Sequence, residues 1–247
     1  MRWPIFVISL PDALDRRREM QAKLFDLGLP FTFLDAVDGR SGLPSHLEPL
    51  IDRSKARTNV WRPMTDGEFA CALSHQSAYE RIIEENLPGA IILEDDAIPM
   101  PGFRDFYQNE LYLNADLIQL DHMKARIWPW SGQSIRGITT FYRPALIAVL
   151  ATGYSITNAG ARDLRNRSFP ICRKADWPCD VLKMDIRLAD PRLIDHPPLG
   201  NAPSFLEEQR AAAEAAETET RKTKLRKYPR SVWFRRWVRK RLSRKIS

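Results

Sequence analysis

Three adjacent carboxylates, Glu94, Asp95 and Asp96, directly follow the apolar segment at residues 90–93. This arrangement is unfavourable in isolation, because like charges repel and a neighbouring core solvates them poorly. A divalent cation removes that cost, since carboxylate oxygens are ligands that hard cations prefer. On an extended chain, Glu94 and Asp96 point to the same side and Asp95 points elsewhere. We therefore expect Glu94 and Asp96 to hold Mn²⁺ or Mg²⁺ that bridges to a diphosphate. The alternative is an acidic turn exposed to solvent.

Further polar residues are candidates for the same site. His75 lies late on a predicted helix, where it could contact a diphosphate or the metal, or could be a buried structural histidine. Asp176 and Asp180 could supply the general base that takes the proton of an acceptor hydroxyl, or could be solvated loop acids. Arg16 and Arg17 stand at a helix start after a strand, a usual place for phosphate recognition. We expect one of these two arginines to be only a surface charge.

The elements that would position these residues begin with a strand–helix–strand pattern. Residues 5–10 form a short apolar, β-branched run typical of a buried strand. Residues 15–28 carry Met20, Leu24 and Leu27 at helical spacing, with Gly28 as the stop signal. Residues 30–37 predict a second strand. Such an opening, with short connections, indicates an α/β nucleotide-binding unit.

Further along the chain, Thr65 and Glu68 are spaced as a capping box, which predicts a helix running towards residue 86. Residues 90–93 and 116–120 predict strands, and residues 145–150 and 154–157 are strand-like. A helix is expected over residues 158–165. Residues 42–63 are polar and predict an irregular, mobile loop. The proline-containing stretch at residues 170–198 predicts an extended loop region that lines the site.

The net charge of +7 is unevenly distributed along the 247 residues. Residues 221–247 contain thirteen Lys and Arg and no acid, which leaves 25 basic residues against all 31 acidic ones in the rest. The chain is thus an acidic globule with a basic tail. Residues 206–220 are rich in Ala and Glu, and predict a helical linker between the two. We expect a domain over residues 1–205, the linker over 206–220 and the tail over 221–247.

The tail mixes its cations with aromatic residues. Trp233 and Trp237, and likewise Phe234 and Val238, lie four residues apart, so a helix here would carry an aromatic stripe in a cationic surround. This composition is typical of a helix lying on anionic lipid. Basic residues interleaved with aromatics also bind nucleic acid, and the alternative function is a nucleic-acid-associated protein that uses this tail. The amphipathic spacing favours lipid, and no nucleic acid is expected as a partner.

Residues 67–97, together with three shorter blocks, resemble glycosyltransferase family 25, the lipooligosaccharide galactosyltransferase group. The shorter blocks are residues 7–10 with Arg16 and Arg17, residues 33–39, and residues 153–161. Ser9 stands where the family usually has Asn, and can still donate and accept a hydrogen bond. Asp176 falls where members carry an acidic residue ahead of a mobile segment. The similarity spans about residues 3–205.

The resemblance implies a GT-A type fold, a Rossmann-like mixed sheet flanked by helices, which binds a sugar nucleotide with a metal motif at a strand end. It implies transfer of a sugar, most often galactose from UDP-galactose, to a glycan or glycolipid acceptor such as lipooligosaccharide or lipopolysaccharide. Together with the residue patterns above, it gives as expected donor contacts Ile8, Ser9, Leu10, Arg17, Ala36, Asp38, His75 and Asp95, with metal ligands Glu94 and Asp96 and catalytic residues Asp176 and Asp180.

Composition and cysteine usage place the chain in a cell compartment. The chain is 44% hydrophobic and 28% charged, typical of an ordinary globular protein. No stretch approaches the roughly 18 apolar residues of a membrane span. The cysteines, Cys71, Cys172 and Cys179, predict free thiols in a reducing compartment. The early apolar run precedes its charges, unlike a signal peptide. We expect a cytoplasmic enzyme, peripheral on the inner face of the cytoplasmic membrane.

Overall fold

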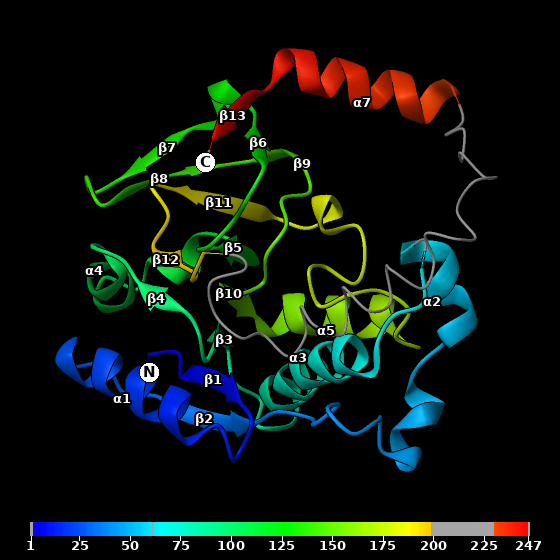
Figure 1. The fold of residues 1–247 in the computed structure, drawn as a ribbon. Coiled ribbons are helices and arrows are strands. Elements are labelled where there is room, and N and C mark those ends of the chain that lie inside the picture. The colour runs from blue at the N-terminus through cyan, green and yellow to red at the C-terminus, as the bar shows by residue number, and fades with distance from the viewer. Residues whose placement is uncertain (1, 61, 199–229, 247) are drawn as a thin grey trace.

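The computed structural model describes residues 2–60, 62–198 and 230–246. An eight-stranded sheet crosses the molecule in the order β2-β1-β3-β10-β5-β11-β8-β7 (Figure 1). In that order the strands are β2 Thr32–Asp35, β1 Ile5–Ser9, β3 Gly89–Glu94, β10 Gly153–Thr157, β5 Leu117–Gln119, β11 Ile186–Asp190, β8 Thr139–Tyr142 and β7 Gln133–Ile135. The sheet mixes parallel and antiparallel pairs.

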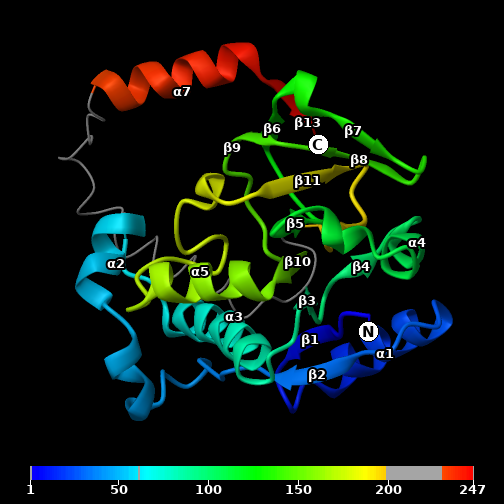
Figure 2. The same cartoon turned by 180° about the vertical axis from the view of Figure 1, so that it is seen from behind.

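Helices cover both faces of this sheet, as the two opposite views show (Figures 1 and 2). Because successive strand residues point to opposite faces, Ile5 and Val7 of β1 pack on one side and Phe6 and Ile8 on the other. The first side packs with α1 (Leu14–Asp26) and α4 (Phe103–Gln108). The second packs with α3 (Asp66–Glu84) and α5 (Asn158–Ser168). The predicted α/β class, a large mixed sheet flanked by helices, is confirmed.

Strand direction gathers several carboxyl ends at one edge of the sheet. Strand β1 is parallel to both β2 and β3, and β5 is parallel to β11. Strand β10 lies between β3 and β5 and is antiparallel to both. Strands β1, β3, β5 and β11 therefore run the same way and end at the same edge. Ligands of open α/β sheets bind outside the carboxyl ends of the strands, so this is the edge where a site is expected.

Two small sheets complete the structure. Strand β12 (Ile194–Asp195) pairs with β4 (Ile98–Pro99), which brings the chain after β11 back to the chain after β3. Gly153 permits this approach, because a Cβ at that position would come within 2.8 Å of the Ile194 side chain. The second sheet has the order β13-β6-β9, formed by Arg244–Ile246, Ala125–Ile127 and Pro144–Leu146.

The N-terminal half follows its sequence pattern closely, with one exception. The Thr65–Glu68 capping box forms as predicted at the start of α3. Residues 42–63, expected to be an irregular loop, instead hold a 3₁₀ helix at Ser45–Leu50 and α2 at Arg53–Val60. Helix α2 has almost no apolar periodicity. It buries only Ala56, against a cluster that includes Met64 and Phe69, so tertiary packing rather than local sequence stabilises it.

The C-terminal half departs further from the sequence-based prediction. Residues 170–198 were expected to be a loop region, yet they contain β11, a strand inside the main sheet, and a 3₁₀ helix at Val181–Lys183. In the segment predicted as a strand at residues 145–150, only the first two residues belong to one, β9. The remaining short elements are 3₁₀ helices at Leu111–Asn114 and Pro129–Ser131. The three cysteines are thiols outside any disulfide, as predicted.

The described part of the basic tail is a helix followed by a strand. Helix α7 (Arg230–Leu242) confirms the predicted C-terminal helix. Strand β13 was not predicted. It pairs with β6, and its Ile246 is buried against Ala125, Ile127 and Leu188. Arg126 donates to the carbonyls of Lys240 and Ser243 at 2.5 and 2.8 Å, which fixes the end of α7 to the domain. The predicted linker at residues 206–220 lies outside the described residues.

Candidate functional site

A cleft opens at the carboxyl edge of the sheet, beside the ends of β1 and β3 and the first turns of α3. Its volume is about 180 Å³. It brings together most of the residues that the sequence nominated for donor and metal binding, although they come from four separate segments of the chain. Those predicted residues are Ile8, Ser9, Leu10, Ala36, Asp38, His75, Glu94, Asp95 and Asp96; Arg16, Arg40, Cys71 and Ser74 also line it.

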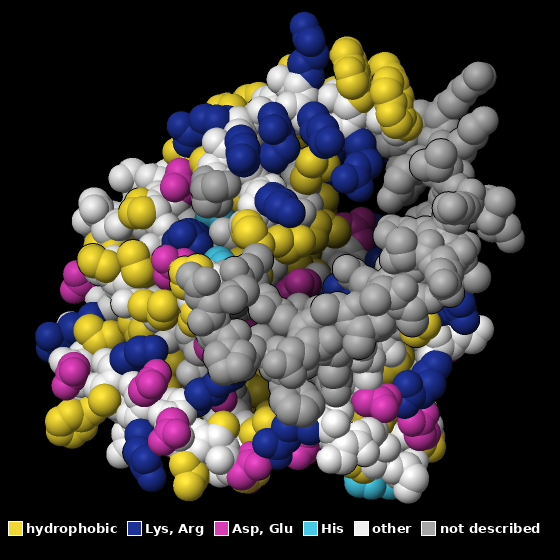
Figure 3. All heavy atoms as spheres, in the orientation of Figure 1, with side chains coloured by type: hydrophobic (Ala, Val, Ile, Leu, Met, Phe, Trp, Pro, Cys, Tyr) yellow, Lys and Arg dark blue, Asp and Glu magenta, His cyan; other side chains and the backbone are white. Residues whose placement is uncertain are grey.

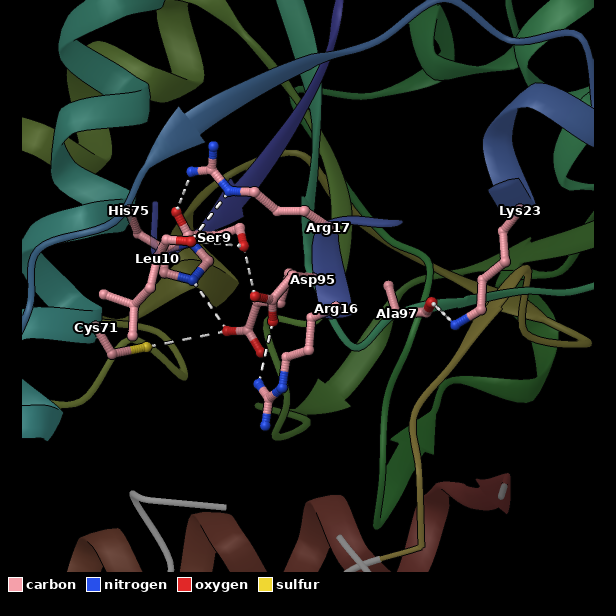
Figure 4. A network of polar contacts seen from close by, with 10 residues as sticks. Ser9, Leu10, Arg16, Arg17, Lys23, Cys71, His75, Asp95 and Ala97 are labelled. Atoms are coloured by element: carbon pink, nitrogen blue, oxygen red, sulfur yellow. Dashed lines mark hydrogen bonds and ion pairs between the residues drawn. The ribbon is translucent and has the colours of Figure 1, made fainter. Parts of the chain in front are cut away.

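Glu94 ends β3 and meets two side chains from α3. His75 Nε2 lies 3.1 Å from Glu94 Oε1, and Cys71 Sγ lies 4.0 Å from the same oxygen (Figure 4). Cys71 and His75 are four residues apart, so they share one helix face. The ligand atoms of the three residues lie within 4.8 Å of one another, as a metal site requires. Cys71 was not predicted to belong to the site, although its spacing from His75 was the available signal.

The second ring nitrogen of His75 contacts a buried pair of tyrosines. Its Nδ1 lies 2.8 Å from the Tyr154 hydroxyl, and the Tyr154 and Tyr79 hydroxyls are 3.1 Å apart. Burial raises the pKa of both tyrosines, so they remain neutral hydroxyl groups. The imidazole is therefore fixed by hydrogen bonds on both nitrogens and orients the Glu94 carboxylate. A histidine in this position serves as the support of a charged ligand.

Asp95, the next carboxylate of the cluster, is held by two other side chains. Ser9 Oγ donates to Asp95 Oδ2 at 2.7 Å, and the Arg16 guanidinium lies 3.2 Å from Asp95 Oδ1 (Figure 4). Ser9, at the end of β1, thus contacts a carboxylate that follows β3. Of Arg16 and Arg17, Arg16 is the one that lines the cleft. Ser9 and Arg16 together balance part of the charge of the carboxylate cluster.

Arg17, the arginine nominated for donor binding, makes protein contacts in this structure. Its guanidinium donates to the carbonyls of Leu10 and Ser9 at 3.0 and 2.9 Å and contacts Asp35 at 2.5 Å. It also packs over the Phe33 ring. These bonds fix the exit of β1 against β2. Arg17 is not among the described residues that line the cleft, so its predicted role in donor binding is left as a prediction.

Asp96 is the most perturbed carboxyl group in the cleft. Its Oδ1 is buried and has no hydrogen-bond partner among the described residues. Burial and the neighbouring charges of Glu94 and Asp95 raise the pKa of Asp96 to about 7. A buried acceptor without a donor is unfavourable by about 1–3 kcal/mol, and more when charged. The structure therefore holds an acceptor that a cation or a donor group would satisfy.

Glu94 and Asp96 do not lie on one extended segment, contrary to the sequence-based prediction. Strand β3 ends at Glu94, and the chain then turns, with Ala97 N donating to Glu94 O at 3.1 Å. The strand geometry that would place the side chains of Glu94 and Asp96 on one face therefore ends at Glu94. Their proximity is still evident, since Glu94 raises the pKa of Asp96. The turn, rather than the pleat, brings the three carboxylates together.

Asp38 lies on the rim of the cleft and is bound to its neighbour Arg40. The Arg40 guanidinium contacts Asp38 and Asp12, both at 2.6 Å. Hydrogen bonds from the Arg40 side chain and backbone lower the pKa of Asp38. Asp38 is therefore a carboxylate held in place for hydrogen bonding at neutral pH.

The two aspartates nominated as the general base lie on the segment between α5 and β11. Asp180 caps the 3₁₀ helix at Val181–Lys183, where its Oδ1 accepts from Leu182 N at 3.2 Å. Asp176 stands between the buried residues Ala175 and Trp177. Neither aspartate is among the described residues that line the cleft. Their assignment as bases therefore rests on the sequence alone.

A second polar cluster was missed by the sequence analysis. Asp121, Asp195 and His196 come within 4.8 Å of one another, beside Arg192, at the same edge of the sheet. No spacing in the sequence points to it, because Asp121 follows β5 while the other three residues follow β11. Only the parallel pairing of β5 and β11 brings them together.

Comparison with known proteins places the chain in a family. The model of glycosyltransferase family 25 (LPS biosynthesis protein) matches residues 2–182. Procollagen galactosyltransferase 1-B of Xenopus laevis is 29% identical over 171 residues, which cover 66% of this chain and 28% of that protein. Lipooligosaccharide biosynthesis protein lic2B of Haemophilus influenzae is 30% identical over 116 residues, covering 47% of this chain and 42% of that protein.

Some relatives have names that denote a lack of activity. The probable inactive glycosyltransferase 25 family member 3 of Rattus norvegicus is 29% identical over 173 residues, covering 65% of this chain and 29% of that protein. The chain spans less than half the length of each of these three relatives. The family match nevertheless covers most of the 247 residues and includes the whole cleft. The chain therefore belongs to glycosyltransferase family 25.

Proposed function

We propose that the chain is a metal-dependent galactosyltransferase that moves galactose from UDP-galactose to a lipooligosaccharide, a lipopolysaccharide or another cell-surface glycan. The names of the Xenopus and Haemophilus relatives support the sugar and the acceptor class. The observation that carries the proposal is the buried, unpartnered Asp96 Oδ1 beside Glu94 in a cleft at the carboxyl edge of the sheet. This arrangement suits a donor carrying a diphosphate and a divalent ion.

The residues present fit an ion of the Mn²⁺ or Mg²⁺ type. Glu94 and Asp96 would hold it, and both are oxygen ligands. The orphaned oxygen of Asp96 is the atom that such an ion would satisfy. When bound, the ion would neutralise the charge that develops on the departing nucleoside diphosphate. His75 keeps the Glu94 carboxylate oriented, and Ser9 and Arg16 hold Asp95, which can bind the donor ribose.

The experiment is a thermal-shift titration with UDP and Mn²⁺, each alone and together. A ligand at 100 times its Kd stabilises the folded state by about 2.7 kcal/mol. For a chain of this size, that raises Tm by roughly 5–10 °C. We expect this rise only when UDP and Mn²⁺ are both present, and transfer activity with UDP-galactose ahead of other nucleotide sugars.

The controls separate the proposal from its alternatives. An Asp15→Asn variant, altered on the exposed face of α1, should show the same shift as the parent protein. An oligonucleotide should give no shift. Stabilisation by the oligonucleotide, without any response to UDP and Mn²⁺, would instead support the nucleic-acid-associated alternative.

We also propose that helix α7 holds the enzyme on an anionic membrane surface, on the cytoplasmic face. Trp233, Phe234 and Trp237 are large apolar side chains that are 61%, 58% and 45% exposed. Exposed cations surround them, namely Arg235, Arg236, Arg239, Lys240 and Arg241. Figure 3 displays this pairing, with hydrophobic side chains at one end of the helix and a row of Lys and Arg beside them.

Aromatic side chains of this kind insert at the headgroup boundary, and each nearby Lys or Arg adds about 1 kcal/mol of attraction to anionic lipid. No described helix is both long and apolar enough to traverse a bilayer. A surface helix anchored to the domain through Arg126 would keep the enzyme beside a lipid-linked acceptor.

The test is cosedimentation with vesicles that contain anionic lipid. We expect a Trp233→Ser/Trp237→Ser variant to bind vesicles about tenfold more weakly. Such a change corresponds to a loss of roughly 1.4 kcal/mol of binding free energy. Binding of the parent protein should fall as salt screens the cations over a Debye length of about 8–10 Å. Activity on a short soluble acceptor should not change.

A Phe25→Ser variant is the matched control, because Phe25 is 79% exposed on α1. It should bind vesicles as the parent protein does. Equal cosedimentation of the double tryptophan variant and the parent would refute the membrane proposal. If the double tryptophan variant instead loses binding to an oligonucleotide, α7 would be assigned to nucleic-acid binding.

A further inference from the structure

A charged cluster follows β5 and β11, at the same edge of the sheet as the cleft. Asp121 is fully buried, and its two oxygens are bound by different partners. His196 Nδ1 lies 3.0 Å from Asp121 Oδ2, and Arg192 lies 3.1 Å from Asp121 Oδ1. Arg192 also contacts Asp195 Oδ1 at 2.8 Å, and the same oxygen accepts from the His196 backbone amide at 2.9 Å. Four residues from two segments thus form one connected network.

The backbone register places this network next to the carboxylate cluster. Glu94 N donates to the carbonyl of Thr152, while Asp121 N donates to the carbonyl of the next residue, Gly153, from the other side of β10. Two strand spacings separate Glu94 from Asp121, a distance of about 10 Å. In addition, Asp195 lies opposite Ile98 in the β12–β4 pair, two residues beyond Asp96. The two clusters are thus neighbours on either side of β10, at the sheet edge where the cleft opens.

The network is built to orient a histidine rather than to bind a cation. The Arg192 guanidinium already occupies an oxygen of each carboxylate, so a metal ion would meet a fixed positive charge. Burial raises the pKa of Asp121, against the opposing charges of His196 and Arg192. A carboxylate bound to Nδ1–H fixes the imidazole tautomer that leaves Nε2 as a proton acceptor. His196 Nε2 has no hydrogen-bond partner among the described residues, and the side chain is 15% exposed.

We infer that His196 is the general base of the sugar transfer and that Asp121 is its positioning residue. The inference rests on the proposed function. His196 Nε2 takes the proton of the acceptor hydroxyl as the hydroxyl oxygen forms a bond to the anomeric carbon of the donor sugar. The bond from that carbon to the diphosphate oxygen breaks, and its electron pair leaves with the nucleoside diphosphate. The imidazolium, stabilised by Asp121, then returns its proton to water. The single displacement inverts the anomeric carbon.

The experiment compares His196→Gln, Asp121→Asn and the double variant under saturating donor and metal. Loss of a general base lowers kcat by about 10²–10⁴-fold. We expect each single variant to lose kcat in this range, with the KM for the donor and the Tm shift produced by UDP and Mn²⁺ both retained. Since Asp121 acts only through His196, the double variant should be no slower than His196→Gln. His196→Asn replaces His196→Gln if the latter fails to fold.

Controls and rival assignments give distinct results. His46→Gln, on an exposed 3₁₀ helix, should retain parental kcat. Loss of the UDP and Mn²⁺ shift in His196→Gln would overturn the inference, because His196 would then bind donor or metal. The inference would also be overturned if the parent protein is active and His196→Gln is equally active. A selective loss of kcat in Asp176→Asn would assign the role of general base to Asp176. A parent protein with neither transfer nor shift would instead overturn the proposed function.

Discussion

Transfer by an Asp96→Asn variant should fall roughly a thousandfold, while the protein remains folded. The metal supplies several kcal/mol of charge stabilisation in the transition state, and each 1.4 kcal/mol, approximately, is a factor of ten in rate. Asparagine keeps the shape of the side chain but removes the charge that holds the ion. Initial rates with UDP-galactose and a soluble acceptor, across a Mn²⁺ titration, measure the loss. Near-parental turnover in Mn²⁺ would contradict the assignment.

The same variant should be more stable than the parent protein when metal is absent. The pKa of Asp96 is raised to about 7 in the folded state, above its ordinary value of 3.8. The ionised carboxylate is therefore disfavoured by folding, and the parent protein loses stability as the pH rises from about 4 through 7. Asparagine carries no charge and avoids this loss. Urea unfolding in EDTA at pH 8 should show the gain, whereas Asp105→Asn, on the exposed face of α4, should show none.

Replacing Glu68 by alanine should destabilise the fold by about 3–5 kcal/mol, because it removes the carboxylate of a buried ion pair. Glu68 is buried, and Arg62 binds both of its oxygens at 2.7 Å. Lys174 adds a contact at 3.2 Å, and the capping box links Glu68 to Thr65. These contacts join α3 to the segments before and after it. Chemical denaturation of Glu68→Ala measures the loss, and Glu80→Ala, which removes a half-exposed pair on the same helix, should cost less than about 1 kcal/mol.

The same ion pair predicts how stability depends on pH. Burial acts to raise the pKa of Glu68, but the Arg62 hydrogen bonds and the Lys174 charge outweigh it and lower the pKa to about 2. The folded state therefore favours the ionised form. The stabilisation is fully present above pH 4.5, roughly, and is lost as the pH falls towards 2. Glu68→Ala should lack this part of the acid sensitivity. Parallel losses in the variant and the parent protein between these pH values would contradict the prediction.

The elements that could be predicted from the sequence are those whose patterns are local and strong. Strand β1 and helices α1 and α3 have clear periodicity and end signals, and all three form where expected. Strand β11 was missed because its five residues include Arg187 and Asp190, so the apolar pattern is incomplete. Its burial comes from pairing with β5 and β8 on either side. Short strands of this kind depend on their partners, which a local pattern does not reveal.

The candidate site divides in the same way. Glu94, Asp95 and Asp96 are adjacent in the chain, and His75 lies on α3, the helix directly before β3. Their grouping therefore follows from a single α–β unit. The Asp121–His196 pair joins residues that follow two different strands, and depends on the order of strands in the sheet. Charge and residue type indicated the first group. The second required the topology.

The pairing of β13 with β6 has a consequence for how the protein is made. Lys245 lies opposite Arg126, so a strand from the middle of the chain acquires its second neighbour only after residues 244–246 have been synthesised. Until then, the edge of β6 has unpaired amides and carbonyls, which can pair with another chain. A nascent chain therefore exposes an aggregation-prone strand edge until late in translation. A truncated protein that ends before α7 would keep that edge permanently, and its aggregation could be mistaken for a loss of function.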